Sequence, residues 1–135
     1  MDRFLKDMEC DIRTMSPLTL AYVGDCVFEL LVRERLVCLA NRPVNDLHKL
    51  SVAQVRADAQ AAAARRILPE LKEAEEAVFK RGRNARTGHT PKNQSESDYH
   101  YATGLEALFG YWYLKGETER LREVFSLIAD GEAHL

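Results

Sequence analysis

Asp25 stands near the centre of an apolar run at residues 18–32, which reads LTLAYVGDCVFELLV. A carboxylate among so many apolar neighbours costs free energy unless it meets a cation, a metal ion or hydrogen-bond donors. A second run of this kind, at residues 102–111, reads ATGLEALFGY and contains Glu106. Two apolar helices, each with an acid embedded near its centre, predict carboxylates that meet at a metal ion between packed helices.

Helical spacing groups each acid with residues that share its face. Residues 18, 21, 25 and 29 lie at spacings of three and four, and residues 103 and 106 lie three apart. Magnesium prefers a few carboxylates and waters, with phosphate oxygens completing its octahedron. Asp25 and Glu106 on facing stripes could therefore hold Mg²⁺. Taken singly, Asp25 could equally be buried against an arginine, and Glu106 could cap a neighbouring turn.

Glycines accompany both acids, at Gly24, Gly104 and Gly110. A glycine inside a helix costs roughly 1 kcal/mol of stability relative to alanine. Either a close approach of two helices or access of a substrate to the backbone would explain that cost.

Helical periodicity runs through nearly every segment and no convincing strand appears, so we expect an all-α fold. The chain has 135 residues, of which 46% are hydrophobic, enough for one core and a single domain over residues 1–135. Ser16 before Pro17 is a helix start, and Ser51 with Gln54 fits a capping box. We expect helices over about 17–39, 51–67, 69–80, from Ser95 or Ser97 to about 115, and 117–129, with a short turn or helix at 44–49.

A basic segment is hidden by the net charge of −2. Residues 77–95 contain five basic side chains, His89 and no acid. Glycine and proline interrupt residues 81–94, so we expect a loop there. Such a segment predicts a local anion site, and its place just before Glu106 favours a chemical role for the acids. The basic residues are Lys80, Arg81, Arg83, Arg86 and Lys92.

The cysteines at positions 10, 26 and 38 are odd in number and lack the CxxC spacing. A reduced intracellular protein is the simple interpretation. No run approaches the roughly 18 apolar residues of a membrane span, and the first residues lack the pattern of a signal peptide. We therefore expect a cytoplasmic protein without a membrane partner.

Two segments resemble the motifs of ribonuclease III catalytic domains. Residues 21–27, AYVGDCV, resemble the signature segment, whose pattern is close to E-x-x-E-F-L-G-D-A-V. Residues 103–110, TGLEALFG, resemble the second motif, close to D-x-F-E-A-L-I-G. Residues 45–51 (NDLHKLS) and 81–85 (RGRNA) look like the Mini-ribonuclease III branch, which has a catalytic domain and no double-stranded RNA-binding domain. The resemblance covers about residues 16–116.

This resemblance implies the ribonuclease III endonuclease domain, a helical bundle. It implies Mg²⁺-dependent endonucleolytic cleavage of double-stranded RNA by a homodimer, with a ribosomal RNA precursor (the ends of 23S rRNA) as the natural substrate. Asp25 and Glu106 match the metal-binding acids, which makes them the catalytic pair. Tyr22 matches the aromatic residue that inserts into the partner subunit. The basic residues named above would bind RNA phosphates.

The chain departs from the longer enzymes at three acids. Leu18 and Ala21 stand at the positions of the signature glutamates, and Thr103 stands at the aspartate of the second motif. The Thr103 hydroxyl could hold a metal-bound water, whereas Leu18 and Ala21 could hold nothing. These losses imply weaker Mg²⁺ binding. The Mini-ribonuclease III branch is similarly reduced and is regarded as active.

Two other interpretations fit parts of the sequence. A non-catalytic RNA-binding module on the same fold, such as a ribosome-assembly factor, is favoured by the missing acids and disfavoured by the retained Asp25 and Glu106. A helical interaction protein with an incidental basic loop is the third, and Mg²⁺ binding that depends on substrate would separate it from the others. Glu29, one turn beyond Asp25, could add negative charge, although a salt bridge is the simpler role.

Overall fold

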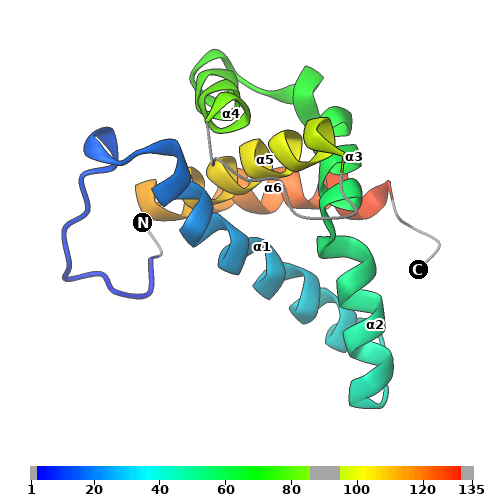
Figure 1. Cartoon of the computed structure of the whole chain (residues 1–135). Coiled ribbons are helices and arrows are strands. Elements are labelled where there is room, and N and C mark those ends of the chain that lie inside the picture. Colours follow the sequence, from blue (N-terminus) through cyan, green and yellow to red (C-terminus); the bar gives the residue numbers. More distant parts are fainter. Residues whose placement is uncertain (1–2, 86–94, 132–135) are drawn as a thin grey trace.

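Helix α5 (Glu96–Lys115) runs through the middle of the molecule, with other helices packed around it (Figure 1). Its buried side chains lie on every side of the helix, as expected of a helix at the centre of a core. The structure is a computed structural model that describes residues 3–85 and 95–131. The other elements are η1 (Ile12–Thr14), α1 (Pro17–Leu39), α2 (Val44–Val55), α3 (Ala57–Ile67), η2 (Leu68–Glu70), α4 (Glu73–Asn84) and α6 (Thr118–Asp130).

The arrangement is a helical bundle built on the contacts of α5. Helices α1, α3 and α4 all pack against it, α6 packs against α3 and α5, and α2 leans on α1 (Figure 1). Every regular element in the two described ranges is helical, which confirms the predicted all-α fold. Within these ranges, no helix is long and apolar enough to cross a membrane.

Local sequence signals start and end the two central helices. The Ser16 hydroxyl accepts a hydrogen bond from the Thr19 amide at 3.1 Å, and α1 begins at the next residue. Ser95, one of the two candidate caps, accepts from the Asp98 amide at 3.0 Å at the start of α5. Gly116 ends α5 with a φ of 82°, which glycine adopts without a steric cost. These predicted boundaries are confirmed.

The capping box predicted at Ser51 and Gln54 is wrong. Both residues lie inside α2, which continues to Val55, and the next helix begins at Ala57. The Ser51 hydroxyl donates back to the carbonyl of His48 at 3.0 Å instead of capping a helix. A serine satisfied by the preceding turn can occupy a helix interior, so its presence alone does not mark a helix start.

The basic segment is also more helical than its composition indicates. Pro69 opens only a 3₁₀ turn, and α4 begins at Glu73 and continues to Asn84. Arg81 and Arg83 therefore lie on the last turn of a helix and not in a loop. Basic side chains are favourable there because they face the negative end of the helix dipole.

A buried ion pair joins α4 to the end of the bundle. The Glu75 carboxylate accepts hydrogen bonds from the Trp112 indole at 3.0 Å and from Nε of Arg120 at 2.8 Å. Burial alone would raise the pKa of Glu75, but the bonds from Arg120, the Lys72 amide and Trp112 together lower it to about 2. These contacts hold α4, α5 and α6 in a defined relation to one another.

Candidate functional site

Helices α1 and α5 cross in direct backbone contact. A Cβ atom at Gly24 would lie 1.6 Å from the Glu106 carbonyl oxygen, and one at Gly110 would lie 1.9 Å from the Leu20 carbonyl oxygen. No side chain fits at either position. Close helix approach, one of the two explanations that the sequence allowed for these glycines, is therefore what the structure shows.

This crossing places the Asp25 and Glu106 carboxyl groups beside each other. Burial raises the pKa of Glu106 to about 9, with further contributions from the negative charge of Asp25 and from a hydrogen bond between the two side chains. At neutral pH, Glu106 therefore holds a proton and donates it to a hydrogen bond with Asp25. Two acids that cannot both ionise make a site that a cation would stabilise.

The oxygen donors at this point fit a hard cation. Thr103 is buried, and its hydroxyl donates to the carbonyl of Tyr99 at 3.0 Å, which leaves lone pairs free to accept a bond from water. Across the described residues, no group of three or more His, Cys, Asp or Glu side chains converges on one point. A pair of carboxylates suits Mg²⁺, which keeps several waters and takes phosphate oxygens from a substrate.

A third helix contributes a residue that the sequence analysis did not single out. Gln60 lies on α3, is only 2% exposed, and its Nε2 atom has no hydrogen-bond partner. It lies near enough to Glu106 to favour the charged form of that carboxyl and so to lower its pKa. The signal in the sequence was one amide within an alanine-rich helix.

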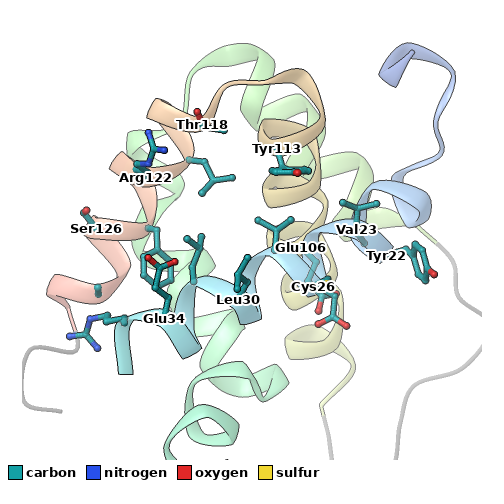
Figure 2. Close-up of a pocket in the computed structure, with 18 of the residues that line it drawn as sticks. Tyr22, Val23, Cys26, Leu30, Glu34, Glu106, Tyr113, Thr118, Arg122 and Ser126 are labelled. Atoms are coloured by element: carbon teal, nitrogen blue, oxygen red, sulfur yellow. The ribbon is translucent and has the colours of Figure 1, made fainter. Parts of the chain in front are cut away.

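A groove of about 1410 Å³ extends from the two acids along α1 (Figure 2). Asp25, Thr103 and Glu106 line one end, and α6 residues from Thr118 to Asp130 line the other. Figure 2 shows α1 along one wall, with Tyr22 beside the acid end and Glu34 toward the far end. The groove therefore joins the acid pair to a longer and mainly apolar surface.

Comparison with known proteins identifies the family. Residues 18–117 match the model of the Ribonuclease III domain. The chain is 47% identical to the Mini-ribonuclease 3 of Thermoanaerobacter sp. over 116 residues, which are 86% of this chain and 82% of that protein. It is 48% identical to the Mini-ribonuclease 3 of Symbiobacterium thermophilum, over 87% of this chain and 90% of that protein. The chain belongs to the ribonuclease III family.

The fold agrees with this membership. A crystal structure of a protein from Fusobacterium nucleatum superposes with a TM-score of 0.82 at 31% sequence identity, covering 90% of this chain and 98% of the other. The resemblance found in the two motifs is thus confirmed, and the chain is a ribonuclease III-type nuclease. Its predicted helical bundle is the ribonuclease III fold.

The positions where this ribonuclease III domain lacks acids are structurally different from one another. Ala21 is buried at the helix crossing, whereas Leu18 is 38% exposed, and both line the groove. Glu29, one turn beyond Asp25, accepts a hydrogen bond from Nε of Arg33 at 2.9 Å. Its charge is therefore compensated on its own helix, as in the salt-bridge interpretation.

The basic residues of α4 differ in their surroundings within the ribonuclease III fold. Arg81 is exposed, Lys80 pairs with Glu76 at 3.4 Å, and the Arg83 guanidinium lies 6.0 Å from the ring of Tyr101. Arg65 of α3, which the sequence analysis missed, lies over the same tyrosine ring at 4.4 Å. The predicted RNA-binding residues Arg86 and Lys92 fall outside the described residues, as does His89.

Proposed function

We propose that this chain is a Mg²⁺-dependent endoribonuclease that cleaves double-stranded or structured RNA. The observation that carries the proposal is the contact of Asp25 with Glu106, where burial and then the negative charge of Asp25 raise the pKa of Glu106. Such an arrangement costs stability in the absence of a cation, and enzymes commonly hold strongly perturbed groups at their catalytic sites. A purely structural acid pair would be expected to have an arginine or lysine against it.

Asp25 and Glu106 would hold the ion, and Thr103 would assist through a water. When bound, the ion would supply Lewis-acid chemistry: it would lower the pKa of a water so that hydroxide is available at neutral pH, and it would stabilise negative charge on the phosphate. Glu106 must release its proton before both carboxylates can bind a cation. Because the water is the attacking group, the protein needs no side-chain nucleophile.

The basic residues of and after α4 would bind the RNA backbone. Phosphate contacts position a nucleic acid without reading its sequence, and A-form RNA is recognised mainly by shape and by its 2′-hydroxyls. The exposed guanidinium of Arg81 supports this role directly. The proposed phosphate-binding residues are Lys80, Arg81, Arg83, Arg86 and Lys92.

A homodimer would provide one acid pair for each RNA strand. Tyr22 is 82% exposed and Leu30 is 49% exposed, although both belong to an apolar helix and both line the groove. Large apolar side chains exposed along one surface are typical of an interaction face. We propose that a second copy of this chain covers Tyr22 and that the two acid pairs then lie along one RNA duplex.

The proposed biological substrate is a ribosomal RNA precursor, trimmed at the 23S ends in the cytoplasm. The three cysteines are all free, which is consistent with a reducing compartment. A non-catalytic RNA-binding role in ribosome assembly is the second candidate. Leu18 and Ala21 favour it, since neither can bind metal.

The deciding experiment incubates the purified protein with a structured RNA in Mg²⁺ or in chelator. The proposal predicts internal cleavage in Mg²⁺ alone and none by the Asp25→Asn variant. A protein that binds the RNA but never cleaves it would favour the assembly role. A protein that cleaves equally well in chelator would contradict the metal dependence.

A further inference from the structure

Gln60 is buried beside Glu106, and its side-chain amide favours the charged form of that carboxyl. Its side chain is 2% exposed and its Nε2 atom has no partner within the described structure. A buried amide donor left unpaired costs free energy, and a folded protein retains such a group where it has a use. The position therefore needs an explanation beyond packing.

Helix packing does not supply that explanation. The other buried side chains of α3 are Ala57, Ala61, Ala63, Ala64 and Ile67, so Gln60 is the one polar residue on the buried face of this helix. A methionine at position 60 would fill about the same volume as the glutamine and would leave no unpaired donor. The amide itself must then be what the site uses.

The neighbour that this amide can serve is Glu106. Gln60 lies close enough to that carboxyl to favour its charged form, whereas Asp25 favours its neutral form. When Glu106 ionises, its oxygens become strong acceptors, and an N–H donor fixed by burial would hold one of them in place. The other oxygen would then be left to face Asp25.

We infer that Gln60 is a positioning residue that orients the ionised Glu106 carboxylate for the metal through a hydrogen bond from its buried amide. The inference rests on the proposed function, because it requires a cation at Asp25 and Glu106. It gives a physical reason why few acids suffice here: a fixed neutral donor takes over the orienting role without adding another negative charge. Hydrogen-bond partners of metal ligands typically govern affinity in this way.

The test replaces Gln60 with methionine and compares it with the matched variant Gln54→Met. Gln54 is also a buried glutamine with an unpartnered Nε2 atom, but it lies on α2 and is absent from the groups that act on Glu106. Binding of Mn²⁺ without RNA is followed by electron paramagnetic resonance. The Mg²⁺ requirement of cleavage and the urea midpoint of the metal-free protein are measured on the same preparations.

We expect Gln60→Met to weaken Mn²⁺ binding and to raise the Mg²⁺ needed for half-maximal cleavage by roughly 10–100-fold. The turnover number at saturating Mg²⁺ should recover to within a few-fold, and the urea midpoint should stay level or rise, because an unpaired amide has been removed. Gln54→Met should leave metal binding unchanged. A structural glutamine would give the opposite pattern, with lower stability and unchanged metal affinity.

The outcomes distinguish this inference from the proposed function. If the wild-type protein needs Mg²⁺ and Gln60→Met binds metal equally well, the inference is wrong and the proposed function stands. Equal losses of metal binding in both glutamine variants would also overturn it. A wild-type protein that cleaves without a divalent cation would overturn the proposed function and this inference together.

Discussion

Gly24 lies so close to Glu106 that a Cβ atom on the glycine would stand 1.6 Å from the glutamate carbonyl oxygen. The backbone of α1 therefore rests directly on the backbone of α5. Asp25 follows Gly24 in the chain, so this backbone contact brings the Asp25 side chain next to that of Glu106. The glycine thereby sets the geometry of the proposed metal site as well as the helix packing.

Gly24→Ala should separate the two helices and disturb the acid pair. Overpacking of this kind costs typically about 1–3 kcal/mol, and a backbone clash lies at the upper end of that range or beyond. Urea denaturation would measure the loss of stability. Gly131→Ala is the matched control, because the three atoms nearest to an added Cβ there all belong to the flexible Arg66 side chain. Equal stability of the Gly24 variant and wild type would contradict the observed crossing.

Asp25→Asn should abolish RNA cleavage while preserving the fold. The amide has nearly the same shape as the carboxylate but carries no charge to hold a cation. Circular dichroism and cleavage would be measured on one preparation, with Asp58→Asn, an exposed acid on α3, as the control. Full activity in a folded Asp25 variant would remove that residue from the site.

Combining Asp25→Asn with Glu106→Gln tests whether both acids serve one ion. Residues that act as a unit lose activity together, so the double variant should be no worse than the more damaging single one. Single-turnover cleavage rates would show this. If the rate losses of the two single variants multiplied in the double variant, the acids would act at separate sites.

The stability of the metal-free protein should depend on pH through Glu106. Its folded-state pKa is raised from 4.5 to about 9, so the unfolded chain loses this proton at lower pH than the folded one does. The stabilisation of the folded state by the Glu106 proton is therefore complete below a pH of about 4.5. It is lost as the pH rises toward 9. Urea midpoints measured in chelator across this range should fall more steeply for wild type than for Glu106→Gln.

Magnesium should reverse this trend, because a bound cation stabilises the ionised pair. Metal affinity should increase with pH up to about 9, since binding displaces the Glu106 proton. Calorimetry in buffers of different ionisation enthalpy would detect the released proton. The absence of proton release at neutral pH would show that Glu106 is already ionised.

Replacing Arg81, Arg83 and Arg86 with alanine should weaken RNA binding and flatten its dependence on salt. Each lost phosphate contact reduces the slope of log K against log salt by about 0.7–0.9. Stability should change little, because Arg81 is exposed and alanine favours the helix. A control with Arg13, Arg42 and Arg56 replaced removes the same charge elsewhere. Equal slopes in the two triple variants would place the RNA away from α4.

Tyr22→Asp should yield monomers that cleave poorly. The ring is 82% exposed in the single chain, and a charge buried in an interface without a partner is costly. Sedimentation at several concentrations would follow the change, with Tyr22→Phe as a control that keeps the apolar ring. A wild-type protein that stays monomeric at tens of micromolar, roughly a ΔG weaker than −6 to −7 kcal/mol, would contradict the paired arrangement.

The elements that could be predicted from sequence are those controlled by near neighbours. Ser16, Ser95 and Gly116 end their helices through hydrogen bonds or backbone conformations within a few residues. Ser51 misled the prediction because the same hydroxyl can also bond to the turn before it. Arg81 and Arg83 misled it because α4 is held to the core by Val78, Phe79 and Gly82, and this packing extends the helix past a glycine.

The functional site likewise combines features that local sequence controls with features that depend on packing between distant segments. The two motifs, the family and the identity of the acids follow from the sequence alone, because chemically specific residues at helical spacing are local information. Helix packing, in contrast, is what buries Glu106 beside Asp25, raises its pKa, and places Gln60 of α3 next to that carboxyl. Burial and charge proximity depend on which helices meet, and that is set by the glycine-mediated contact of α1 and α5 and not by any one segment.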